Sequence, residues 1–77
     1  MKKILEYLAS SLVAHPKKIL VEEVEVDNYL NLVLKVHPDD VKIVIGKNGR
    51  TIKALRELLK IKAKEGKKVN IKVEAIS

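Results

Sequence analysis

Hydrophobic and polar positions alternate with different periods along the chain and divide it into six short segments. In the first segment, apolar residues recur four positions apart, which is the spacing of one face of an α-helix. The residues of this predicted stripe are Ile4, Leu8 and Leu12, with Leu5, Ala9 and Val13 beside them. The pattern predicts a helix over residues 1–14. His15-Pro16 should end it, because a residue that precedes proline avoids helical dihedral angles.

Two segments that are typical of β-strands follow the first helix. Residues 19–26 are rich in valine and glutamate, and we expect the three glutamates to lie on an exposed side. Residues 29–36 alternate with a period of two, so one face should be buried. The side chains expected on that face are Leu30, Leu32, Leu34 and Val36. Asp27-Asn28 separates the two segments and is a two-residue turn signal, which predicts a hairpin.

A short helix is predicted next, over about residues 39–45. Proline and two aspartates at its start suit the first turn of a helix, where proline loses no hydrogen bond and acidic groups face the positive end of the helix dipole. We expect Val41, Val44 and Ile45 to form its apolar stripe. Gly46 should end this helix.

A longer helix is expected from Arg50 to about Glu65, because Ile52, Leu55 and Leu59 recur at helical spacing. Gly66 is the expected glycine cap at its C-terminal end. Residues 68–76 alternate again and predict a third strand, which should lie parallel to the second after the two-helix connection.

The order of elements is therefore helix, strand, strand, helix, helix, strand. Each strand alternates, so one face of the sheet should be buried and the other solvated. The sequence predicts an α+β fold, a three-stranded sheet covered on one face by three helices, in a single domain over residues 1–77. No apolar run approaches the length of a membrane span, so we expect a soluble, cytoplasmic protein.

Composition narrows the range of functions. The chain has no cysteine, which excludes a disulfide framework and a thiolate metal site. Its 16 Lys and Arg outnumber its 10 Asp and Glu and give a net charge of +6, which favours an anionic partner. The balance is uneven, at −2 for residues 1–40 and +8 for residues 41–77. The partner should therefore contact the second half of the chain.

The loop between the two later helices contains the most informative motif. Gly46 and Gly49 join the helices across four residues, and glycine permits both a tight reversal and a close approach to the backbone. The loop also leads into a helix N-terminus, whose free N–H groups and dipole favour anions. Lys47 and Arg50 add full positive charges at the same place. These features fit a phosphodiester backbone.

The segment Ile45-Gly46-x-x-Gly49-x-x-Ile52, set between two helices and flanked by strands, resembles the K-homology (KH) domain of RNA-binding proteins. The extra helix and strand on the N-terminal side match the type II arrangement. The resemblance covers essentially the whole chain, and it is greatest to the small bacterial single-KH proteins of the KhpA type.

The resemblance implies a groove for about four single-stranded nucleotides, clamped at their backbone by the glycine loop. The candidate RNA-binding residues are this loop, its flanks and a nearby lysine: Val44, Ile45, Gly46, Lys47, Asn48, Gly49, Arg50, Thr51 and Lys53. It also implies an RNA chaperone or regulator, linked in some bacteria to cell shape. Proteins of this type act as homodimers or pair with a larger KH-containing protein.

A second candidate surface follows from helical phase alone. At about 100° per residue, Ile61 lies far from the expected core stripe and near Ala54, with Leu58 between. An apolar side chain away from the core suggests self-association or a protein partner, although it is also compatible with a stray exposed aliphatic residue.

Other interpretations remain open. The double-glycine loop could belong to a helix-turn-helix DNA reader, and the ligand could be single-stranded DNA. The chain could also be an assembly adaptor that acts mainly through protein partners. We expect His15 and His37 to be turn and cap residues, with no metal site and no cofactor. No constellation of residues indicates catalysis, so we expect no enzymatic activity.

Overall fold

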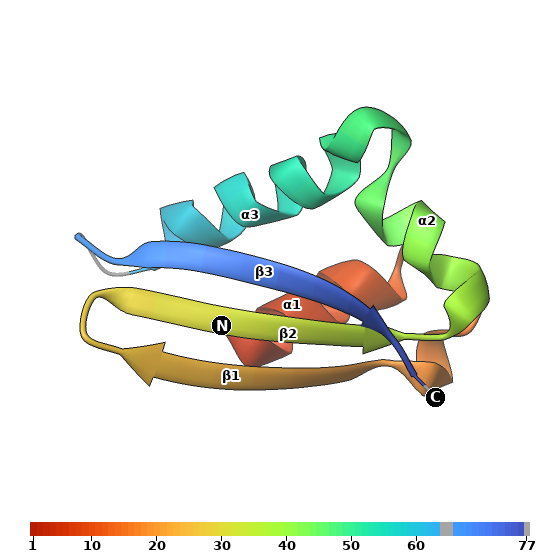
Figure 1. Ribbon diagram of the computed structural model, residues 1–77, viewed down its shortest axis with the longest axis horizontal. Coiled ribbons are helices and arrows are strands. Elements are labelled where there is room, and N and C mark those ends of the chain that lie inside the picture. Colours follow the sequence, from red (N-terminus) through yellow and green to blue (C-terminus); the bar gives the residue numbers. More distant parts are fainter. Residues whose placement is uncertain (64–65, 77) are drawn as a thin grey trace.

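The computed structural model describes residues 1–63 and 66–76 (Figure 1). Its helices and strands follow the predicted order: α1 (Lys2–Ser10), β1 (Leu20–Val26), β2 (Tyr29–Val36), α2 (Val41–Ile45), α3 (Arg50–Lys62) and β3 (Lys68–Ala75). Single 3₁₀ turns lie at Pro16–Lys18, Pro38–Asp40 and Lys47–Gly49. The α+β class is confirmed.

The three strands form one sheet with β2 in the centre. β1 and β2 are antiparallel, and Val26 pairs with Tyr29 across the predicted two-residue turn. β2 and β3 are parallel, as predicted, with Leu32 opposite Ile71. The parallel pair requires a long connection, and α2 and α3 supply it.

One face of this sheet packs against the helices (Figure 1). β2 contributes its whole predicted apolar face, because its alternation turns every second side chain inward. The remaining core residues come from every other helix and strand: Leu5, Ala9, Val21, Val44, Leu55, Leu59 and Val69. None of the helices within the described residues is long and apolar enough to span a membrane.

The first helix is shorter than predicted, and its buried face is shifted by one position. α1 ends at Ser10, where the hydroxyl donates to the carbonyl of Tyr7 at 2.9 Å. Such side-chain bonds compete with helical backbone bonds and favour helix ends. Leu5 and Ala9 are fully buried, whereas Ile4 and Leu12 of the predicted stripe are 37% and 42% exposed.

The predicted glycine cap of the long helix is also wrong. α3 ends at Lys62 with Ala63 in extended conformation as its cap. Gly66 does have a positive φ of 88°, but it serves the turn that leads into β3. The predicted extension to Glu65 falls on residues 64–65, outside the described part of the chain.

The glutamates of β1 do not share one exposed side. Glu22 lies on the outer face of the sheet, where Lys35 donates to it at 2.9 Å. This contact raises the pKa of the lysine above its usual value. Strand alternation places Glu23 and Glu25 on the face of buried Val21, beside the helices.

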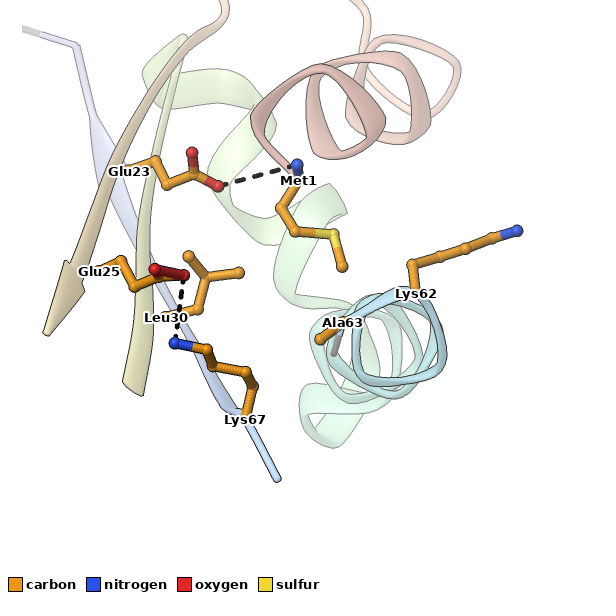
Figure 2. A pocket seen from close by; sticks show the side chains of 7 residues that line it. All are labelled: Met1, Glu23, Glu25, Leu30, Lys62, Ala63 and Lys67. Atoms are coloured by element: carbon orange, nitrogen blue, oxygen red, sulfur yellow. Dashed lines mark ion pairs between the residues drawn. The ribbon is translucent and has the colours of Figure 1, made fainter. Parts of the chain in front are cut away.

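Figure 2 shows where these two glutamates point. They line a hollow of about 410 Å³ near the start of α1 and the end of α3. Glu25 pairs there with Lys67 at 3.4 Å. Glu23 pairs there with the N-terminal ammonium group of Met1 at 3.8 Å, so both carboxylates of this hollow are matched by cations.

Candidate nucleic-acid interface

The loop that joins α2 to α3 has a backbone shape that depends on glycine. Gly46 has φ 79° and ψ 169°, Asn48 has φ 57° and Gly49 has φ 74°. Residues that carry a side chain rarely adopt the backbone conformation of Gly46. Asparagine, by contrast, tolerates the left-handed region in which Asn48 lies. A β-carbon on Gly46 would also lie 2.8 Å from the backbone nitrogen of Thr51. Gly46 is therefore required by both conformation and space.

Gly49 is under a weaker constraint. The nearest atom to a β-carbon built on it is Cγ2 of Ile52, at 4.0 Å. Only its positive φ favours glycine, since the space beside it is open. The two glycines that look equivalent in the motif are thus held for different reasons.

The loop is closed by its own backbone and opens directly into α3. The N–H of Gly46 donates to Lys42 at 2.8 Å, and the N–H of Gly49 donates to Gly46 at 3.1 Å. α3 starts at the next residue, Arg50. The N–H of Arg50 already donates to the carbonyl oxygen of Lys47. The helix dipole and the N–H groups that follow in the first turn of α3 point toward the loop and favour an anion there.

Two cations lie at this helix start, Lys47 and Arg50, and two more follow along the first two turns of α3, Lys53 and Arg56. Within residues 1–63 and 66–76, none of them forms an ion pair. By contrast, Lys60, one turn further along, pairs with Glu57 at 3.7 Å. The positive charges nearest the loop are therefore available to an external anion.

The predicted site residues are contiguous in space, but they are not equally accessible. The exposed ones are Ile45, Lys47, Asn48, Arg50 and Lys53, and the half-buried ones are Gly46, Gly49 and Thr51. Val44 is fully buried in the core, so it supports the loop from below and does not present a surface to a ligand. Ile43, which the sequence analysis did not select, is 44% exposed on α2. Because the helix is only five residues long, its pattern did not reveal which of its apolar residues faces solvent.

α3 carries two different exposed faces. At about 100° per residue, Lys53, Arg56 and Lys60 fall on one side of the buried stripe of Leu55 and Leu59. The apolar residues that the sequence analysis singled out fall on the other side: Ala54, Leu58 and Ile61. Of these, Leu58 is 47% exposed and Ile61 is 77% exposed.

The apolar face borders a hollow between α1 and α3, of about 360 Å³. Its lining is mostly apolar: Leu8, Ser11, Leu12, Arg50, Thr51, Ala54, Leu55 and Leu58. Arg50 and Thr51 belong both to this hollow and to the start of α3, so the two candidate surfaces meet there.

The chain is similar to known proteins both in sequence and in fold. A family model described as KhpA/KhpB, KH domain, matches residues 2–74. The chain is 48% identical over 59 residues to a protein of Halalkalibacterium halodurans named RNA-binding protein KhpA, covering 77% of this chain and 78% of that one. A protein of the same name from Clostridium perfringens is 45% identical over 74 residues, 95% of this chain and 99% of the relative.

A solved structure shares the fold. It is the crystal structure of Era in complex with MgGDPNP and nucleotides 1506–1542 of 16S ribosomal RNA. The match has a TM-score of 0.62 at 22% identity and covers 96% of this chain but 29% of Era. At that identity the likeness concerns the fold of one part of Era.

Proposed function

Because the chain belongs to the KhpA/KhpB family of KH domains, we propose that it binds single-stranded RNA and grips the RNA backbone with its Gly46–Gly49 loop. The observation that carries this proposal is that a glycine-dependent loop leads into the start of α3, with four cations at the loop and along the first two turns that form no ion pair in the described residues. Relatives at up to 48% identity are named for RNA binding.

In this proposal the contacts divide by chemistry. The first turn of α3, together with Lys47 and Arg50, holds phosphates, and Lys53 and Arg56 extend the positive track along the helix. Ile45 offers an apolar surface to bases, since it is 36% exposed beside the loop. Phe and Trp are absent from the chain, so base stacking on those rings is not part of the mechanism.

The mechanism is binding without catalysis. Phosphate contacts position an RNA but carry no sequence information, so a grip directed at the backbone suits a protein that acts on many RNAs. A role as RNA chaperone or regulator in the cytoplasm is consistent with that property.

The decisive variant is Lys47→Asp combined with Asn48→Asp. Asn48 has a left-handed φ, which aspartate also tolerates, so the loop should keep its shape while its tip becomes acidic. We expect the affinity for an RNA oligonucleotide to fall at least about tenfold, the equivalent of 1.4 kcal/mol. Undiminished RNA binding by a folded double variant would contradict the clamp.

A matched control removes the same amount of charge elsewhere. Lys2→Asp with Lys3→Ala changes the net charge by the same three units. Both lysines are exposed at the start of α1, next to Met1, which lines the hollow at the far end of α3. This control should retain most of the affinity. Parallel titrations with RNA and DNA oligonucleotides of one sequence test the alternative ligand, single-stranded DNA.

A second candidate function is assembly with a protein partner, and the exposure of Leu58 and Ile61 favours it. In this alternative, two copies, or this chain and a larger KH-containing protein, associate through the apolar face of α3. Two linked domains would also raise the affinity for RNA by avidity. The two functions can be tested separately, because Lys53 and Arg56 lie on the other side of α3 from Leu58 and Ile61, although Arg50 borders both surfaces.

A further inference from the structure

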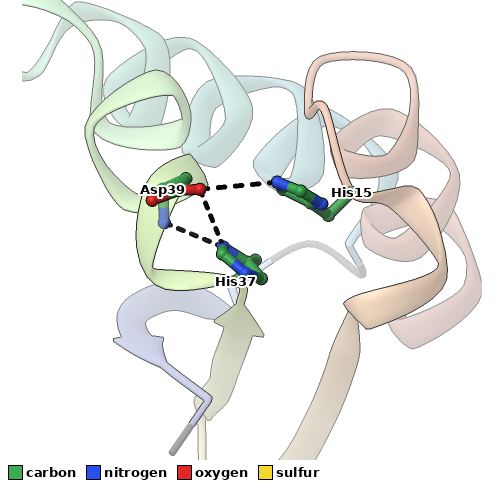
Figure 3. Close-up of side chains that lie close together, drawn as sticks. All are labelled: His15, His37 and Asp39. Carbon is green, nitrogen blue, oxygen red and sulfur yellow. Dashed lines mark hydrogen bonds and ion pairs between the residues drawn. The ribbon is translucent and has the colours of Figure 1, made fainter.

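Two His-Pro dipeptides that are far apart in the sequence meet at one end of the domain. His15-Pro16 lies in the connection between α1 and β1, and His37-Pro38 lies between β2 and α2. The imidazole rings stack with centroids 3.9 Å apart and planes inclined by 22° (Figure 3). Proline restricts the backbone of the residue before it, so both histidines sit on segments of limited freedom.

Asp39 points its carboxylate at both rings (Figure 3). Its Oδ2 atom lies 3.6 Å from Nε2 of His15 and 3.5 Å from Nδ1 of His37. One donor atom from each of the three residues lies within 4.8 Å of the other two. In tetrahedral zinc sites, bonds of about 2.0–2.1 Å place two ligand atoms about 3.3–3.4 Å apart. The two separations from the Asp39 oxygen are close to those of a metal site. The imidazole rings are stacked, so they would have to turn from this arrangement for both nitrogens to face one ion.

We propose that His15, His37 and Asp39 bind a divalent transition-metal ion, with Zn²⁺ as the best fit. Two imidazole nitrogens and one carboxylate are a donor set that suits zinc and not magnesium or calcium, which prefer oxygen ligands. From the sequence we expected no metal site, since no cysteine or third histidine accompanies His15 and His37. Only the fold brings His15 to His37 and Asp39, which lie more than twenty positions later.

The hydrogen bond that His37 accepts is compatible with this role. Its Nδ1 atom accepts a hydrogen bond of 3.0 Å from the N–H of Asp39, so that nitrogen carries a lone pair and no proton. A metal ion would take this lone pair in place of the N–H. The exposed N–H of Asp39 can then donate to water, so losing its hydrogen bond to His37 costs little free energy.

A neighbouring carboxylate holds the site in place. Asp40 is fully buried and accepts the backbone N–H groups of Ala14 and His15, each at 3.0 Å. This fixes the segment that carries His15 against the start of α2. Supporting contacts of this kind orient metal ligands in known sites. The His15 and His37 side chains are 41% and 34% exposed, and that of Asp39 is 73% exposed, so an ion and a water ligand can enter from solvent.

The test uses the full chain without a histidine tag. The chain has two histidines, so their imidazole signals in nuclear magnetic resonance spectra report on this site alone. Titration with Zn²⁺ should shift both sets of signals and saturate at one ion per chain, and Mg²⁺ at millimolar concentration should shift neither. Unshifted imidazole signals, or saturation at one zinc ion per two chains, would overturn the proposal.

Three variants extend the test. His37→Asn keeps an acceptor for the Asp39 N–H, His15→Phe keeps a ring to stack on His37, and Asp39→Asn keeps the shape of that side chain. Each should weaken Zn²⁺ binding at least about tenfold in calorimetric titration. Asp27→Asn, in the hairpin turn, should leave it unchanged. Folded variants that all bind zinc as tightly as the parent chain would refute the assignment.

Discussion

The buried carboxylate of Asp40 accepts a hydrogen bond of 3.0 Å from the backbone N–H of His15, 25 positions earlier in the chain. A second bond of the same length comes from Ala14. These bonds tie the connection after α1 to the start of α2, the helix that ends at the glycine loop. An ionised group without water is costly unless hydrogen bonds compensate it, and here backbone N–H groups do so.

We predict that Asp40→Ala destabilises the fold by about 2–4 kcal/mol, because it removes two charge-assisted bonds and leaves their donors unpaired. Asp40→Asn should cost less, since the amide oxygen can still accept one bond. Chemical denaturation measures both values. The exposed neighbour provides the control, and Asp39→Asn should change stability by less than about 0.5 kcal/mol. Equal costs at positions 39 and 40 would contradict this account.

The two glycines of the loop should respond differently to substitution. Gly46→Ala places a β-carbon 2.8 Å from Thr51 N and imposes a backbone conformation that costs about 1–3 kcal/mol. Gly49→Asn meets open space and a left-handed φ that asparagine tolerates, so it should cost less than about 1 kcal/mol. Urea unfolding measures the stability of each variant, and RNA titration measures its affinity for RNA. The prediction fails if Gly49→Asn proves the more damaging change.

Periodicity predicted the strands better than the helix faces. In β2, strict alternation allows only one buried face, and Leu30, Leu32 and Leu34 are buried as predicted. The first helix has apolar residues over a wide arc, so the pattern did not define whether Leu8 or Leu5 lies at the centre of the buried face. The end of this helix was predicted too late in the chain. Ser10 donates to the carbonyl of Tyr7, and the spacing of hydrophobic residues carries no information on such a contact.

The two candidate sites also differ in how far the sequence predicts them. The glycine loop is contiguous in sequence, so its residues and charges were found before the fold was known. The different constraints on Gly46 and Gly49 were not predicted, because the close approach of Thr51 to Gly46 is visible only in the folded path of the loop. The cluster of His15, His37 and Asp39 could not be predicted, since tertiary structure alone brings His15 to the other two residues.

The salt dependence of RNA affinity should report how many cations contact phosphates. Release of counterions from single strands gives a slope of about −0.7 in log affinity against log salt for each phosphate neutralised. If Lys47, Arg50, Lys53 and Arg56 each contact a phosphate, the slope should be about −3. Arg50→Ala should reduce its magnitude by about 0.7, whereas Lys2→Ala should leave it unchanged. An Arg50→Ala slope equal to that of the parent chain would remove this residue from the contact.

Association through α3 should depend on Ile61, the most exposed of its apolar residues at 77%. Full burial of an isoleucine contributes about 1.5–3 kcal/mol, and an aspartate at the same place in both copies would add repulsion to the lost burial. We predict that Ile61→Asp is a folded monomer by light scattering, while the parent chain is a dimer.

Val24→Asp makes the same change at a 56% exposed position on the outer face of the sheet and should remain dimeric. A dimeric Ile61→Asp, or a parent chain that is monomeric at all concentrations, would refute association through this face. RNA binding by the monomeric variant should then persist, because Lys53 and Arg56 lie on the other side of α3, but with reduced affinity, because avidity is lost.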